Sequence, residues 1–228
     1  MIEVKNISVS YGSHQVLRNF NAVFDLNKVH GIVGLNGAGK STFFNTLFGL
    51  VKPETGQIIY NENVLQRKSI AYLEASNYFY PGITAAEYLA IFPQRNSEFN
   101  QTVLFNLFHL IPDELIENYS TGMKKKLALM AVLKNDLPVM IFDEPFNGLD
   151  LESNKILELI ISRLKEKQKT IFISSHVLEP LLNICDEIHY LADGYIKQSF
   201  NKNEFESINS KLFDELIKHA TAVVNKNL

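Results

Sequence analysis

The sequence predicts an α/β fold with a mostly parallel core sheet, an N-terminal antiparallel β subdomain and an inserted α-helical subdomain. Three observations support this prediction. Residues 2–12 alternate apolar and polar side chains, as a half-buried strand does. Residues 84–134 have mostly helical spacing. After residue 136, short apolar runs flank a helical segment, and a strand–helix–strand return is typical of a parallel sheet with crossover helices.

The size and composition of the chain set limits on its class. Its 228 residues suffice for one large domain, or for a domain with a sub-lobe. The net charge of −3 argues against nucleic acid as a partner, because phosphate binding needs excess positive charge. The single cysteine, Cys185, cannot form an internal disulfide, which favours a reducing compartment such as the cytosol. No apolar run approaches the roughly 20 residues of a spanning helix. We therefore expect a soluble chain.

The N-terminal third predicts hairpins, a short strand and a helix. The segments "IEVKNISVSYG" and "VLRNFNAVFDL" flank the turn-like "YGSH" and predict an antiparallel pair. The segment "KVHGIVG" predicts a short strand, and "KSTFFNTLFGL" predicts a helix that stops near Gly49. A second hairpin is expected at "TGQIIYNENV".

The middle of the chain predicts helices, and this helical segment separates two segments in which strands are expected. "TAAEYLAIF" opens with a capping box, in which Thr84 is followed by Glu87. "EFNQTVLFNLFHLI" and "MKKKLALMAVL" follow with helical periodicity. We expect a core domain from residues 1–73 and 136–200, with a helical subdomain at 74–135 inserted into it.

Residues 201–228 are expected to form a C-terminal helical tail. The tail puts apolar side chains on one helical face, which we expect to pack on the domain. These residues are Phe205, Ile208, Leu212, Leu216 and Ile217.

The stretch "GLNGAGKST" fits the pattern of a phosphate-binding loop. Backbone N–H groups can converge on phosphate oxygens where glycine replaces a side chain that would block them. The following helix directs its positive N-terminal end at the same anion. This loop identifies a phosphate-loop NTPase, in which Lys40 reaches the β- and γ-phosphates and Ser41 ligates Mg2+. The predicted binding residues are Gly34, Leu35, Asn36, Gly37, Ala38, Gly39, Lys40, Ser41 and Thr42.

A second acidic element follows the apolar strand "VMIF". Four apolar residues in a row suit a strand buried on both faces, and ligands of open α/β sheets bind at the carboxyl ends of the strands. Asp143 is the predicted Mg2+ residue, and Glu144 is the predicted base that deprotonates the attacking water. The alternative, a helix N-cap at a strand end, explains either acid alone but explains both poorly. No Asn-Lys-x-Asp motif for guanine occurs, which favours ATP.

With these motifs in this order, residues 2 to about 200 resemble the ATP-binding subunit of an ABC (ATP-binding cassette) transporter. The resemblance implies that Tyr11, in "VSYGSHQVL", stacks on adenine. The alternative for Tyr11 is ordinary packing. The resemblance also implies that His176, in "SSH", is the switch histidine that contacts the γ-phosphate, and that Asp150, in "FNGLD", belongs to the D-loop. A serine-hydrolase interpretation of "SSH" lacks a Gly-x-Ser-x-Gly elbow.

The segment "YSTGMKKKL" stands where the family has its signature motif, normally Leu-Ser-Gly-Gly-Gln. Ser120 and Gly122 match that motif, whereas Thr121 and Met123 depart from it. The resemblance implies that these four residues cap the γ-phosphate of ATP held by the opposite subunit. Residues 124–126 are lysines in the first helical turn, where positive charge opposes the helix dipole. A nearby anion or a solvated basic face would each relieve that conflict.

One family element is missing. The family has a glutamine after the strand that follows the second hairpin, and this glutamine contacts Mg2+ and responds to the membrane partner. Ungapped spacing from "SIAYL" puts Ala75 at that position, with Glu74 before it. Glu74 is a further candidate Mg2+ ligand. The departure bears on how transport is coupled to ATP.

The resemblance implies an ATPase that powers transport, most like bacterial export subunits. Its cofactors are ATP and Mg2+. Its expected partners are a second ATP-binding subunit, in a homo- or heterodimer, and integral membrane permease subunits. The expected location is peripheral, at the cytoplasmic face of a bacterial cell membrane. Two alternatives stay open: a soluble ABC-type ATPase that serves a protein assembly such as iron–sulfur cluster biogenesis, and a regulatory module that hydrolyses nothing.

Overall fold

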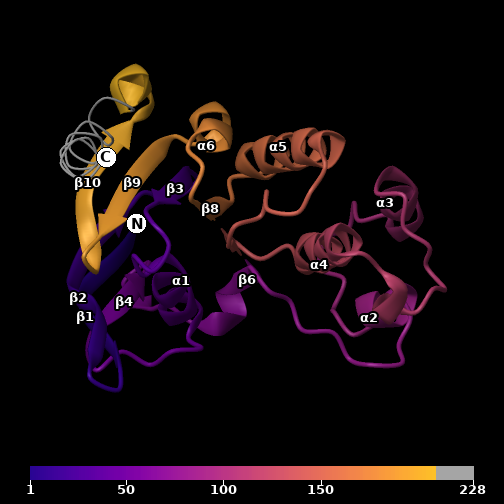
Figure 1. The fold of residues 1–228 in the computed structure, drawn as a ribbon, viewed down its shortest axis with the longest axis horizontal. Helices are drawn as coiled ribbons and strands as arrows, with labels where there is room; N and C mark the ends of the chain where they lie inside the picture. The colour runs from indigo at the N-terminus through magenta and orange to yellow at the C-terminus, as the bar shows by residue number, and fades with distance from the viewer. Residues whose placement is uncertain (209–228) are drawn as a thin grey trace, which may run out of the picture.

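The computed structural model describes residues 1–208, which form two sheets with helices around them (Figure 1). The strands are β1 (Ile2–Tyr11), β2 (His14–Phe24), β3 (Val29–Val33), β4 (Thr55–Tyr60), β5 (Asn63–Val64), β6 (Ile70–Leu73), β7 (Val139–Phe142), β8 (Thr170–Ser175), β9 (Glu187–Ala192) and β10 (Tyr195–Asn201). The α-helices are α1 (Lys40–Phe48), α2 (Ala85–Ala90), α3 (Gln101–Leu107), α4 (Thr121–Asn135), α5 (Leu151–Glu166) and α6 (Glu179–Ile184). Short 3-10 helices are η1 (Arg67–Ser69), η2 (Ile116–Asn118) and η3 (Lys202–Ser207).

The larger sheet has six strands in the order β10-β9-β3-β8-β7-β6. The strands from β9 to β6 pair in parallel, and β10 is antiparallel to β9. The predicted α/β fold with a mostly parallel core sheet is therefore confirmed. The carboxyl ends of β3, β7 and β8 meet at one edge, because these strands are parallel and near neighbours.

The smaller sheet is antiparallel, in the order β2-β1-β4-β5, which confirms both predicted hairpins. The alternation along β1 is not uniform: Ile2 and Val4 are buried, and then Ile7 and Val9. The shift occurs at Asn6, where φ is 53° and the pairing with β2 and β4 changes register. This irregularity keeps apolar side chains on one face of a strand whose sequence does not alternate strictly.

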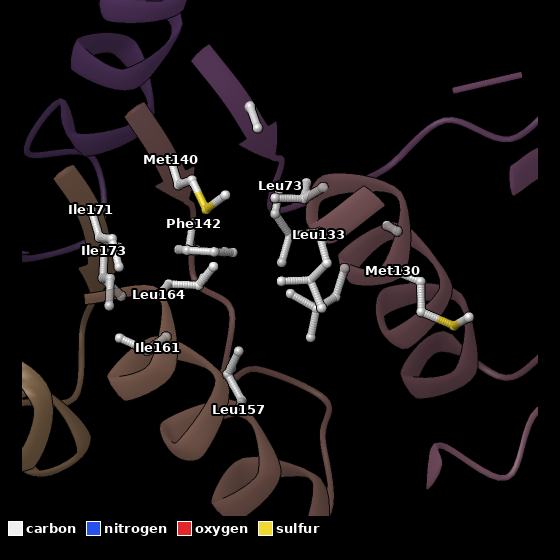
Figure 2. Packing of buried hydrophobic residues seen from close by; sticks show 14 of the residues in the cluster. Leu73, Met130, Leu133, Met140, Phe142, Leu157, Ile161, Leu164, Ile171 and Ile173 are labelled. Carbon is white, nitrogen blue, oxygen red and sulfur yellow. The ribbon is translucent and has the colours of Figure 1, made fainter. Parts of the chain in front are cut away.

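The two faces of the six-stranded sheet belong to two hydrophobic cores. On one face the sheet packs against α1 and the antiparallel sheet, and on the other against α4, α5 and α6. Strand β7 shows the division, because Val139 and Ile141 belong to the first core, and Met140 and Phe142 to the second. Figure 2 shows the second core, in which side chains of β6, β7 and β8 meet those of α4 and α5. Its labelled residues are Leu73, Met130, Leu133, Met140, Phe142, Leu157, Ile161, Leu164, Ile171 and Ile173.

The predicted helix signals agree with the observed helix ends. Both hydrogen bonds of the capping box between Thr84 and Glu87 are present at the start of α2. Gly49 ends α1 with a φ of 82°, a left-handed conformation that glycine adopts without strain. Helices α2, α3 and α4 lie within residues 74–135 and gather away from the antiparallel sheet (Figure 1).

The start of the expected tail packs on the domain. Phe205 and Ile208 are buried in the second core, as the apolar face predicted. Leu212, Leu216 and Ile217 lie outside the described residues. Within residues 1–208, no helix is both long and apolar enough to span a bilayer.

Candidate nucleotide site

The loop between β3 and α1 has the geometry that an anion requires. A Cβ added at Gly34 would lie 2.3 Å from the Leu191 carbonyl oxygen, so only glycine fits there. Gly39 has a φ of 105° and precedes α1 without any side-chain hydrogen bond to the helix. The first N–H groups of α1 are thus left without a side-chain cap, and a helix N-terminus of this kind suits phosphate.

Lys40 lies beside this loop and is almost fully buried. Its Nζ donates hydrogen bonds to the carbonyl oxygens of Gly34 at 2.8 Å and Leu35 at 3.3 Å, and lies 3.6 Å from Oε1 of Glu144. A cavity of about 400 Å³ opens at this point. It is lined by His14, Val16, Asn36, Gly37, Gly39, Lys40, Ser41, Thr42 and Glu144.

Asp143 follows β7 and is 1% exposed. Its Oδ1 accepts a hydrogen bond from the Ser174 hydroxyl, and its Oδ2 lies 3.4 Å from the Tyr72 hydroxyl, which also lies 3.1 Å from Oδ1 of Asn45. Burial, and then the charge of Asp143, raise the pKa of Tyr72, which keeps that hydroxyl protonated as a donor. The Asp143 carboxylate and the Ser41 hydroxyl, at the start of α1, offer the hard oxygen ligands that Mg2+ prefers. These residues therefore fit the ion.

Glu144 and His176 are in contact. Nδ1 of His176 lies 3.0 Å from Oε2 of Glu144, and the Asn147 amide donates to the same oxygen at 3.3 Å. The Glu144 side chain is 14% exposed and that of His176 is 43% exposed. One carboxylate, one imidazole and the phosphate loop thus share one edge of the sheet.

The backbone of Glu144 is held in an uncommon conformation, with a φ of 47°. Two side chains hold it there: its N–H donates to the Ser174 hydroxyl at 2.8 Å, and its carbonyl accepts from Lys125 at 2.7 Å. Lys125 also donates to the Asn147 carbonyl at 2.8 Å. A left-handed glutamate is strained and persists where its surroundings compensate.

The residues of the signature segment lie elsewhere. Ser120 is the N-cap of α4, and its hydroxyl accepts a hydrogen bond from the Met123 N–H at 3.2 Å. A Cβ added at Gly122 would lie 2.9 Å from the Gly148 carbonyl oxygen. Helices α1 and α4 lie on opposite sides of β6 in Figure 1. None of Ser120, Thr121, Gly122 and Met123 lines the cavity at the phosphate loop.

The three lysines after the signature segment do not share one environment. Lys125 is buried, and burial lowers its pKa, although the negative charges of Glu144 and Asp143 act to raise it. Lys126 Nζ lies 3.5 Å from Asp150, and Lys124 donates to the Glu117 carbonyl at 3.4 Å. Each lysine has a partner within its own chain, so a uniformly solvated basic face is wrong.

Asp150, Tyr11 and Glu74 lie outside the cavity lining. Asp150 caps α5 by accepting from the Ser153 N–H at 2.7 Å, and this bond lowers its pKa to about 2. Tyr11 is 52% exposed at the end of β1, where it pairs with His14. Glu74 follows β6, and burial raises its pKa. The positive charge of Arg67 opposes this increase, and the negative charge of Asp143 adds to it.

Sequence reasoning missed four residues of this region. His14 and Val16 line the cavity from β2, and Ser174 and Lys125 hold the acidic pair. Ser174 had one available signal, because it lies near the carboxyl end of β8, the strand next to the one that carries the acids. Nothing local marked Lys125, since its partners lie 19 and 22 residues away.

Comparison with known proteins agrees with this geometry. A family model described as "ABC transporter" matches residues 17–147. The lantibiotic transport ATP-binding protein SrtF of Streptococcus pyogenes is 31% identical over 203 residues, which are 86% of this chain and 89% of that protein. The bacitracin transport ATP-binding protein BcrA of Bacillus licheniformis is 29% identical over 226 residues, 94% of this chain and 74% of that protein.

The fold has a close solved counterpart. A structure of an ATP-binding subunit of an ABC transporter superimposes with a TM-score of 0.82 at 28% identity. The alignment covers 97% of this chain and 99% of that one.

Proposed function

This chain belongs to the ABC transporter family as an ATP-binding subunit that hydrolyses ATP to power transport, and we propose that Glu144 and His176 carry the hydrolysis. The observation that supports this assignment is the 3.0 Å contact between Oε2 of Glu144 and Nδ1 of His176 beside the phosphate-loop cavity. A carboxylate so held can accept the proton of an attacking water. The imidazole then faces the γ-phosphate end of the nucleotide.

ATP binds along residues 34–42 in this proposal. The uncapped start of α1 and the buried Lys40 supply positive potential for the triphosphate. Lys40 exchanges its bonds to the loop carbonyls for phosphate oxygens. Tyr11 offers an aromatic face to adenine, and its pairing with His14, which lines the cavity, keeps it near the rim.

Ser41 and Asp143 hold Mg2+ in this proposal, with Glu74 as a further candidate ligand. The ion neutralises phosphate charge during phosphoryl transfer. Ser174 and Tyr72 fix the two oxygens of Asp143, so the carboxylate is oriented before the nucleotide arrives. Ser174 also accepts from the Glu144 N–H, and a single hydroxyl thereby aligns the metal ligand and the base.

A second ATP-binding subunit completes the site. Ser120 to Met123 face the nucleotide of the partner, and Asp150 lies at the same boundary. The separation of these residues from the cavity of their own chain supports a site shared between two chains. The pair is a homodimer or a heterodimer.

In this proposal, ATP hydrolysis drives transport through membrane permease subunits. The relatives act in bacitracin and lantibiotic transport, which favours export of a peptide antibiotic or a similar molecule by this system. The chain then sits at the cytoplasmic face of a bacterial cell membrane. The matches give no support to a soluble ATPase of iron–sulfur assembly. Co-purification of a membrane protein separates these two functions.

The experiment that tests the catalytic assignment is steady-state ATP hydrolysis by Glu144→Gln. Loss of a general base lowers turnover by about 100-fold or more. ATP binding persists, and the variant accumulates as an ATP-bound dimer, which light scattering detects. The matched control is Glu166→Gln, because Glu166 is exposed on α5. This variant should keep the parental turnover. Parental turnover in Glu144→Gln would refute Glu144 as the base.

A further inference from the structure

Three polar side chains meet on a buried face of the six-stranded sheet, away from the phosphate loop. His30 lies on β3, and Glu187 and His189 lie on β9. The parallel register pairs His30 with Glu187 and Ile32 with His189. Because side chains alternate along a strand, Glu187 and His189 share one face, and His30 joins them from the neighbouring strand.

The three side chains aim one ligand atom each at a common point. Nδ1 of His30 lies 3.2 Å from Nε2 of His189 and 3.5 Å from Oε2 of Glu187. Nε2 of His189 lies 3.7 Å from the same carboxylate oxygen. Tetrahedral zinc with bonds of about 2.0–2.1 Å separates its ligand atoms by about 3.4 Å. The triangle therefore has the size of one face of a tetrahedral site.

The remaining atoms of each ligand have partners that orient it. Nε2 of His30 lies 2.8 Å from the Asp25 carbonyl oxygen, to which it donates, so Nδ1 keeps its lone pair. Nδ1 of His189 lies 2.8 Å from the Ser199 hydroxyl. Lys28 donates to Oε1 of Glu187 at 2.6 Å, which leaves Oε2 for the common point. Metal-binding histidines and carboxylates have outer partners of this kind.

Burial and charge suit a cation. His30 is fully buried and His189 is 3% exposed, with the rings of Phe24 and Phe172 against His30. Lys28 forms ion pairs with both Asp25 and Glu187, so two carboxylates face one ammonium group and the cluster has a net negative charge.

We propose that His30, Glu187 and His189 bind one divalent cation of the zinc class. Solvent fills the fourth position, at the side where Glu187 is 15% exposed. The metal fastens β3 to β9 below the phosphate loop, because β3 ends at Val33 and Gly34 begins the loop. Its role is structural, and it is separate from the Mg2+ of hydrolysis.

The test is Co2+ and Zn2+ binding to untagged, chelator-treated full-length protein without nucleotide. We expect about one Co2+ per chain, with the visible absorption of a tetrahedral site that Zn2+ abolishes. We also expect Zn2+ to raise the melting temperature. His189→Gln and Glu187→Gln each weaken binding at least about 100-fold, because loss of an outer partner alone costs up to that much.

Two controls separate this site from other causes. His109→Asn removes an exposed histidine and leaves the Co2+ spectrum unchanged. Lys28→Gln removes the ion pair of Glu187 but keeps all three ligands, so it retains the tetrahedral spectrum. Absence of a saturable tetrahedral Co2+ spectrum in the parent overturns the proposal, and the histidines are then only hydrogen-bonded to each other. Unchanged binding by folded His189→Gln overturns it as well.

Discussion

The N-terminal ends of α1 and α4 are two helix starts with opposite surroundings. At α1, Gly39 supplies no cap, and Lys40 and Glu144 stand beside the open amides within the same chain. At α4, Ser120 caps the helix with its own side chain, and none of Ser120, Thr121, Gly122 and Met123 lines the cavity at the phosphate loop. The first end has its partners inside one chain, whereas in the proposed function the second end faces ATP bound by another chain. The comparison shows that two helix starts of one chain differ in what they leave open: amides at α1, and a capped end outside the cavity at α4.

The largest effect is expected at the α1 end. Lys40→Ala removes the buried ammonium beside the loop and lowers ATP turnover by about 1,000-fold, since a preorganised charge next to phosphate is lost. Calorimetry checks that ATP affinity falls as well. Lys155→Ala, on the exposed face of α5, is the matched control and should behave as the parent. Normal ATP affinity in Lys40→Ala would contradict the assignment of the loop.

A smaller effect is expected at the α4 end. Ser120→Asp keeps a good N-cap but sets a negative charge toward the phosphate of the facing chain. Turnover should fall about 100-fold, because like charges across an interface cost several kcal/mol. ATP affinity of the single chain should stay unchanged. Ser120→Asn caps equally well without charge and should retain most of the activity, and equal losses in both variants would argue against the shared site.

A still smaller effect on turnover is expected for Ser174, the residue that links Asp143 and Glu144. Ser174→Ala removes the hydroxyl that bonds both Asp143 and the Glu144 N–H, and turnover should fall about 10-fold. Ser175→Ala is the control, because its hydroxyl accepts from the Val177 N–H and contacts neither acid. A kcat assay at saturating ATP distinguishes them. Equal turnover in the two variants would remove Ser174 from the site.

The last prediction joins both ends in one mixture. Lys40→Ala chains and Ser120→Asp chains each have strongly reduced activity alone. When equal amounts are mixed and pair at random, about one quarter of the ATP sites should be intact, so about one quarter of the parental activity should return. Half of the pairs are mixed, and each mixed pair holds one intact site of two. ATPase activity against mixing ratio provides the measurement. No recovery would indicate that both ends serve the same chain.

Local pattern was sufficient for the main elements. Glycine spacing predicted the phosphate loop, since only glycine permits the close approach at Gly34 and the left-handed backbone at Gly39. The apolar run before Asp143 predicted a strand buried on both faces, and β7 is such a strand. Alternation predicted the N-terminal hairpin, although the irregularity at Asn6 was missed because bulges leave a weak sequence signal.

The sequence by itself determined the order of strands and helices, the loop and the acidic pair, because hydrophobic period and glycine chemistry act over a few residues. Tertiary structure alone decided that Ser174 holds Asp143 from 31 residues away, and that His30 meets His189 across 159 residues. The physical reason is strand order: β3 lies between β8 and β9, and parallel pairing brings together side chains whose separation in the chain leaves no local pattern.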